Sequence, residues 1–316
     1  MNSDYIPRLR SELLRAGATK QTRRRAARVA RGLRPVAVAA AVTVLAVAGV
    51  LALSDGRGDE TPVGSGDTLR LTYRTEPSGT ATTEQAARVM RARLAAAGIT
   101  DARVSAAATG LSITVPATAR ADVAALGPTG RLSIYDWERS LLGPRDAGGD
   151  AVSKAEAESR AAGRPGARVL RAPGAAPDGW FALGGDPALT NADVDRAYAA
   201  TDPQTQEPVV AIEFTASGRT AFEALTRDLA RRGEEQAAGG PGGLEAAQHL
   251  AIVLDDRIVS VPFIDYRQAP NGIDGAAGTH ISGGLTPESA RRVAALLSAG
   301  PLDARLVLES EDSVAG

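Results

Sequence analysis

The sequence predicts a protein of the α+β class in which one transmembrane helix precedes a large folded part. Three observations lead to this prediction. An uncharged apolar run at 36–53 follows a strongly basic segment. After residue 67, short runs alternate apolar and polar side chains, and longer runs between them repeat apolar residues every three or four positions. The order of these runs, strand-helix-strand-strand-helix-strand, occurs twice.

The apolar run at 36–53 (VAVAAAVTVLAVAGVLAL) would extend roughly 27 Å as a helix, close to the thickness of a bilayer core. Residues 1–34 hold ten basic and two acidic side chains, a net charge of +8, and acidic residues follow the run. By the positive-inside rule, the tail at 1–34 is cytoplasmic, the helix at 35–54 crosses the cell membrane once, and the remainder is extracytoplasmic. A cleaved signal peptide ending near Ala52-Leu53-Ser54 and a buried helix of a soluble protein are the alternatives.

Charge and cysteine content limit the partners and the chemistry. The basic tail either fixes the topology or contacts anionic lipid headgroups. The rest of the chain carries −9, because the total is −1, so nucleic acid is a poor partner for the main domain. The absence of cysteine excludes disulfides, thiolate nucleophiles and Cys-based zinc sites.

A stalk rich in glycine and charge at 55–66 leads into a first α/β unit at 67–138. Its helix is predicted to start at a capping box made by Thr82 and Gln85 and to stop at Gly98. The strands are expected at 69–73, 102–106, 111–115 and 131–137, with a second, short helix near 120–126. The order βαββαβ indicates a ferredoxin-like unit, an antiparallel sheet with two helices on one face.

Residues 139–178 lose this periodicity and predict a linker or insertion, within which 154–162 is a candidate helix. A second unit at 179–310 repeats the order of the first, and 311–316 is a tail. Its first helix is predicted to open at Ser217 and to end at Gly233, before a mobile glycine-rich loop. Two strands at 250–254 and 257–264 are predicted to flank an Asp255-Asp256 turn. The last helix is predicted to start at Thr286 and Pro287 and to end at Gly300 and Pro301, before a final strand at 304–309. The pattern leaves open whether the two units lie side by side or interleave.

The residue types that carry out catalysis or bind metal do not occur in the spacing that either role requires. We therefore expect a protein that is not an enzyme and holds no cofactor or metal. The two histidines, His249 and His280, lack HxH or HExxH spacing. Carboxylate pairs at Asp255-Asp256 and Glu234-Glu235 lie on predicted turns, where solvated charge is ordinary. The GGPGG segment at 239–243 lacks the lysine and the flanking strand of a phosphate-binding loop.

Four segments resemble the first extracytoplasmic domain of SecD, an accessory of protein export: VVAIEFTASGRTAFEALT, LAIVLDDRIVSVPFI, HISGGLTPESARRVAALLSAGPL and RLVLES. A fainter resemblance to the same domain covers 69–137. The matched positions are those that make turns or fill the core, so the resemblance implies architecture first. They are Thr215, Gly218, Phe222, Asp255, Ser260, Pro262, Ile281, Ser282, Gly283 and Gly300. Asp256 departs from the family, which usually has glycine there.

The resemblance implies a domain divided into a base and a head, the head binding unfolded polypeptide as it emerges. We therefore expect a membrane-tethered module that binds exported polypeptides or components of the Sec translocon. No second apolar run follows the domain, so we expect this chain to lack the proton path of the SecD membrane part. The alternative is a structural or regulatory cell-envelope protein that uses the same fold for protein–protein interaction.

Overall fold

The computed structural model of the protein describes residues 68–142, 151–171, 179–203, 205–240, 243–282 and 285–314. The predicted basic tail, transmembrane helix and stalk lie outside these residues. In the described ranges, no helix is both long enough and apolar enough to cross a bilayer.

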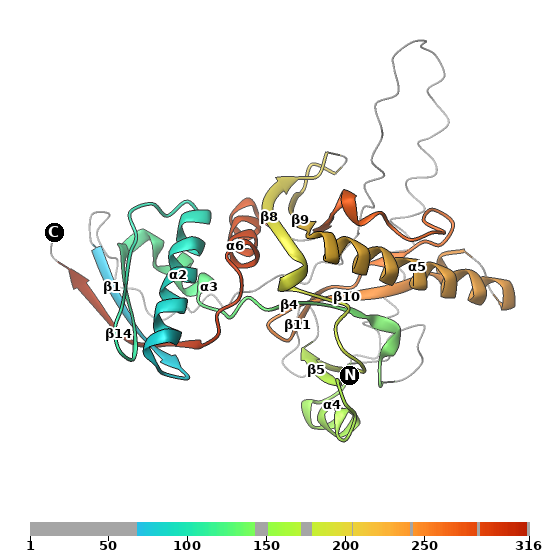
Figure 1. Ribbon diagram of the computed structural model, residues 1–316, viewed down its shortest axis with the longest axis horizontal. Coiled ribbons are helices and arrows are strands. Elements are labelled where there is room, and N and C mark those ends of the chain that lie inside the picture. The colour runs from blue at the N-terminus through green and yellow to red at the C-terminus, as the bar shows by residue number, and fades with distance from the viewer. Residues whose placement is uncertain are drawn as a thin grey trace, which may run out of the picture.

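The described chain is a mixed α+β structure with three sheets, drawn in Figure 1. The helices and strands follow one another as β1 (Thr68–Glu76), α2 (Thr80–Ala96), β2 (Arg103–Ala106), β3 (Gly110–Pro116), α3 (Arg120–Leu126), β4 (Leu132–Asp136), α4 (Lys154–Ala161), β5 (Arg168–Arg171), β6 (Trp180–Leu183), β7 (Leu189–Thr190), β8 (Val194–Thr201), β9 (Pro208–Phe214), α5 (Ala216–Gly239), β10 (Gln248–Leu254), β11 (Arg257–Ser260), β12 (Phe263–Ile264), β13 (Thr279–Ile281), α6 (Pro287–Ser298) and β14 (Arg305–Val314).

The elements form two bodies with α6 between them (Figure 1). The first body comprises α2, α3 and a four-stranded sheet in the order β14-β1-β3-β2. The second body holds α4, α5, a sheet in the order β6-β5-β11-β10-β4-β7 and a small sheet in the order β13-β9-β8. The predicted order of strands and helices in 67–138 is present as β1-α2-β2-β3-α3-β4.

The two predicted units interleave, because each sends its last strand into the other body. β4 does not join β1 and β3 but pairs antiparallel with β10, Ile134 opposite Ile252. β14 instead pairs antiparallel with β1, Leu71 opposite Glu311. The antiparallel sheet expected for 67–138 therefore lacks its last strand. Of the two arrangements that the sequence left open, side by side or interleaved, the strand pairing shows the second.

The burial of each exchanged strand explains its place. On β4, Ile134 packs in the core shared with the first body, and Tyr135 packs on the opposite face against Phe181 and its neighbours. A strand that is apolar on both faces needs cover on both, which a position inside the large sheet provides. β14 is half-buried or exposed along its whole length, as suits an edge strand.

Residues 139–142 and 151–171, the described residues of the segment expected to be a linker or insertion, fold into the second body. The candidate helix at 154–162 is observed as α4, with Ser153 as its N-cap, and it packs beside β5 and β6. The Trp137 ring meets the Phe181 ring edge-on, with centroids 4.9 Å apart, in a satellite core that includes Ala157 and Leu170. The weak periodicity of a short helix and two four-residue strands concealed this small unit.

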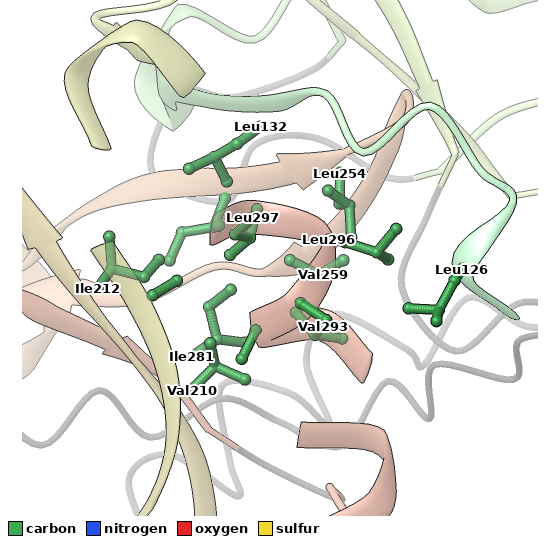
Figure 2. Packing of buried hydrophobic residues seen from close by; sticks show 14 of the residues in the cluster. Leu126, Leu132, Val210, Ile212, Leu254, Val259, Ile281, Val293, Leu296 and Leu297 are labelled. Atoms are coloured by element: carbon green, nitrogen blue, oxygen red, sulfur yellow. The ribbon is translucent and has the colours of Figure 1, made fainter. Parts of the chain in front are cut away.

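Helix α6 joins the two bodies through one continuous hydrophobic core. Figure 2 shows Val293, Leu296 and Leu297 of α6 among side chains from both sides. Val210 and Ile281 lie near Val293, and residues of β10, β11 and α3 surround Leu296. Because every one of these side chains is buried, separating the bodies would expose a large apolar surface.

Sequence signals at the helix ends are partly confirmed. The N-cap Thr286, the first-turn Pro287 and the left-handed stop at Gly98 are all observed. The capping box at Thr82 is wrong, because α2 begins at Thr80 and its N-cap Gly79 makes no side-chain hydrogen bond.

Helix α5 also differs from its prediction, since it continues past Gly233 to Gly239. A Cβ on Gly233 would lie 2.9 Å from the Ala246 carbonyl oxygen, so glycine marks a close approach and not a helix end. Beyond that point, an i,i+4 ion pair of 2.7 Å between Arg231 and Glu235 supports the extra turns. Residues 234–239 of the predicted loop are therefore helical.

Candidate interaction surface of the second body

The small sheet β13-β9-β8 has a buried face and an outer face. On the buried face, Val210, Ile212 and Ile281 pack against α6. The register aligns Tyr198, Ala211 and His280 across the outer face. Among the residues that the structure describes, Tyr198 is one of two large hydrophobic side chains that are exposed, with 41% of its surface accessible to solvent. An aromatic ring with one accessible face is well suited to contact another chain.

Charged side chains flank Tyr198 on the outer face. The Arg196 guanidinium donates to both carboxylate oxygens of Glu213, at 2.7 and 3.2 Å, and lies 4.9 Å from the Tyr198 ring centroid. These hydrogen bonds hold the pKa of Glu213 below its usual value. The outer face therefore combines an aromatic ring with a neutralised charge pair.

Close backbone packing sets the turn from β9 into α5. Thr215 is the N-cap of α5, and its hydroxyl accepts a hydrogen bond from the Gly218 N–H at 3.1 Å. The Thr215 N–H donates to the Asp193 carbonyl at 2.9 Å, and a Cβ on Gly218 would collide with that carbonyl. Phe222 follows on the buried side, its ring centroid 5.0 Å from that of Phe214. These three sequence-matched positions thus lie together.

The Asp255-Asp256 turn contacts the chain that crosses between the bodies. Both aspartates have positive φ, 51° and 60°. The Asp255 carboxylate accepts hydrogen bonds from the Thr129 hydroxyl and from the N–H groups of Gly130 and Arg131, both at 2.9 Å. Asp255 therefore fastens the loop before β4 and is not a freely solvated turn charge.

The remaining matched positions are spread over three places. Ser260 ends β11 and is buried, and the Pro262 carbonyl accepts from the Leu250 N–H at 3.0 Å. Ile281 ends β13 opposite Val210, and buried Ser282 follows it. Gly283 lies outside the described residues. The matched positions therefore surround the core of the second body and do not converge on one cleft.

Gly300, the last matched position, lies in a network that the sequence analysis missed. It has a φ of 78°, and its carbonyl accepts from the Arg93 guanidinium at 2.9 Å. Arg93 is fully buried on α2 and also donates to the carbonyls of Leu126, Pro128 and Thr129, at 2.7, 2.5 and 2.8 Å.

Burial lowers the pKa of Arg93 to about 10, which leaves it charged at neutral pH, and the nearby Asp255 opposes that shift. The two crossings also bond directly, the Leu302 N–H donating to the Thr129 carbonyl at 2.8 Å. Arg93 thus holds both segments that connect the bodies. The signal in the sequence was an arginine three residues after Met90 on the apolar face of α2.

The two histidines lie in different surroundings. Burial lowers the pKa of His280, and Asp202 opposes that shift. His249 lies at the start of β10, where its N–H and its Nδ1 contact one carboxylate oxygen of buried Glu138, at 2.9 and 3.0 Å. Over the part of the chain that the structure describes, no three His, Cys, Asp or Glu residues are grouped to hold a metal ion.

This architecture, two bodies joined by paired crossings and one shared helix, has relatives among known proteins. Residues 168–304 match the family model described as SecDF, P1 head subdomain. The protein translocase subunit SecD of Rickettsia bellii (strain RML369-C) is 35% identical over 132 residues, which is 42% of this chain and 20% of that protein. SecD of Calditerrivibrio nitroreducens (strain DSM 19672 / NBRC 101217 / Yu37-1) is 31% identical over 124 residues, or 39% of this chain and 20% of that protein.

Among solved structures, the chain is similar in fold to the crystal structure of SecDF in the super-membrane-facing form. The TM-score is 0.53 and the identity 20%, over 81% of this chain and 32% of that chain. The chain is therefore similar to the P1 region of SecD proteins, in sequence over residues 168–304 and in fold over most of its length. The chain spans 20% of the length of the two curated SecD relatives named above.

Proposed function

We propose that this protein is a membrane-tethered, extracytoplasmic module that binds unfolded polypeptide and assists protein translocation. The observation that carries the proposal is the match of residues 168–304 to the SecDF P1 head subdomain, a range that covers most of the second body together with α6. The relatives named above are protein translocase subunits, which supports a role in export. No catalytic step is part of the proposal.

The sequence supports the proposed tether, and the SecD relatives support the proposed protein partners. The apolar run at 36–53, after a tail of net charge +8, supports a single membrane crossing with the tail in the cytoplasm. Exported polypeptides and components of the Sec translocon are the proposed protein partners. Anionic lipid headgroups are the proposed partners of the basic tail, each basic residue near the surface contributing about 1 kcal/mol.

Site-specific photo-crosslinking in cells tests this function. A photoreactive residue replaces Tyr198 on the second body or, as a matched control, Leu308 on the first, because both side chains are exposed. We expect exported polypeptides that are still unfolded to crosslink at position 198 and much less at position 308. Labelling of neither position, with folded protein present in the membrane, would count against the proposal. Labelling only by other envelope proteins would favour a structural or regulatory role.

A further inference from the structure

Strand β8 is the outer strand of the small sheet, and its register shows which of its backbone groups face outward. Thr201 lies opposite Pro208, which has no N–H to donate, so this is a pair without hydrogen bonds between the strands. Ala199 and Ala197 lie two and four residues earlier and share its orientation. The N–H and C=O groups of these three residues therefore point away from β9.

One of the three outward positions is already occupied. The Ala197 N–H donates to the Ser298 hydroxyl at 3.1 Å, and that hydroxyl donates to the Ala197 carbonyl. The last residue of α6 thus satisfies both groups, as a neighbouring strand would. At Ala199 and Thr201, by contrast, no hydrogen-bond partner is found among the residues that the structure describes. Both residues are exposed.

Other edges of the described sheets are short, covered or charged. β14 is charged, with Glu309, Glu311 and Asp312. On β2, the Arg91 guanidinium donates to the carbonyl of Val104. β6 is covered by bridges to Ser140 and Val152. β7 and β13 have two and three residues. Such devices block the addition of another strand. From 197 to 201, β8 instead reads Ala-Tyr-Ala-Ala-Thr, without charge or proline.

We propose that the edge of β8 from Ala199 to Thr201 binds an extended segment of unfolded polypeptide as an added strand. Only a backbone in extended conformation repeats donors and acceptors at the spacing of this edge. The small side chains of Ala199 and Ala200 let such a backbone approach. Tyr198, on the outer face, is placed for cross-strand contact with a side chain of the added strand. Because the contacts are made by backbone, binding depends little on the sequence of the polypeptide.

A bare extended chain fits this edge better than a second copy of the protein. The free stretch is only three residues long, and α6 flanks it at Ala197. Two folded copies that met along it would bring each α6 against the β8–β9 hairpin of the other. This inference rests on the proposed function and names the form in which the polypeptide is bound.

The test measures binding of fluorescently labelled, reduced and carboxymethylated α-lactalbumin, a permanently unfolded polypeptide, to the full-length protein in detergent micelles. Ala199→Pro removes one outward N–H and leaves the hydrogen bonds from β8 to β9 in place. We expect it to raise the Kd at least tenfold. Ala199→Thr is the matched control, since it keeps the N–H, and its Kd should stay within twofold of wild type. Ser298→Ala frees both groups of Ala197, and we expect it to tighten binding about threefold.

Hydrogen exchange of the wild-type protein provides a second measurement that does not depend on the folding of a variant. Saturating polypeptide should slow exchange of the Ala199 and Thr201 amides at least fivefold, relative to the Tyr198 amide. Unchanged exchange at Ala199 and Thr201, or equal affinity of Ala199→Pro and wild type, would overturn the inference and leave the proposed function standing. No binding by the wild type would refute both. If Ala199→Pro converts a dimer into a monomer in sedimentation, the edge binds a second copy and the inference is wrong.

Discussion

Replacing Arg93 by methionine tests whether one buried side chain holds the two bodies together. Arg93→Met keeps most of the volume of the side chain but removes the donors to four carbonyls, those of Leu126, Pro128, Thr129 and Gly300. The Thr129 carbonyl keeps a hydrogen bond from Leu302 N–H, so three carbonyls lose a partner.

At about 1 kcal/mol for each buried or part-buried group left without a partner, the expected loss in the free energy of unfolding is about 3 kcal/mol. The loss is at the lower end of the range for breaking a buried ionic network, about 3–5 kcal/mol, because methionine also removes the cost of burying the charge. Arg93→Lys keeps that charge on a single nitrogen with three donors, which cannot reach four carbonyls. We therefore expect the lysine variant to be at least as unstable.

The assay is urea unfolding, followed by circular dichroism and by tryptophan fluorescence. Both tryptophans, Trp137 and Trp180, lie in or against the satellite core of the second body, whereas Arg93 lies on a helix of the first. With a slope of about 2 kcal/mol per molar urea, the midpoint should fall by about 1.5 M in both signals. Arg88→Met is the matched control, because Arg88 is exposed on the same helix, and it should change stability by less than about 0.5 kcal/mol. A change under 1 kcal/mol for Arg93→Met would refute the reasoning.

Five further substitutions, in three tests, probe local features by urea unfolding. Gly218→Ala would push a methyl group against the Asp193 segment and should destabilise the protein by about 1–3 kcal/mol. Gly239→Ala is the control, because no atom lies within 4 Å of the new Cβ, and it should be neutral or slightly stabilising. Equal effects of the two variants would contradict the close packing at Gly218. Asp256→Gly should stabilise the protein by about 0.5–1 kcal/mol, because glycine adopts the positive φ at this position without strain. Asp255→Gly should destabilise the protein by about 2 kcal/mol, because it loses three hydrogen bonds. A change of the same sign in both variants would refute this account of the turn. Burial lowers the pKa of His280, so as pH falls below about 6.5, the value in the unfolded chain, the unfolded chain takes up the proton first and stability decreases. His280→Gln should reduce this loss of stability between pH 7.5 and 5. An unchanged dependence of stability on pH in the variant would contradict the prediction.

The sequence by itself determined the local features of this protein. Apolar side chains alternate at Val210, Ile212 and Phe214 and predict the strand observed as β9, and the Thr286-Pro287 pair predicts the start of α6. Both signals depend on residues a few positions apart. Phe222 is among the positions that the SecD resemblance assigns to turns or to the core, and it is buried in the core. The SecD resemblance was also legible in the sequence, because it was carried by turn and core positions in a fixed order.

Only the tertiary structure decided the rest. An apolar run predicts a strand but not its neighbour, so β4 and β14 could be assigned to the two bodies only by the cover that each body offers. The small unit around α4 lacked periodicity because its elements are too short to repeat it. Arg93 donates hydrogen bonds to backbone carbonyls that are distant in sequence. Ser298 likewise exchanges hydrogen bonds with the distant backbone of Ala197. Backbone groups leave no pattern of residue types, so contacts of this kind are settled only when the chain has folded.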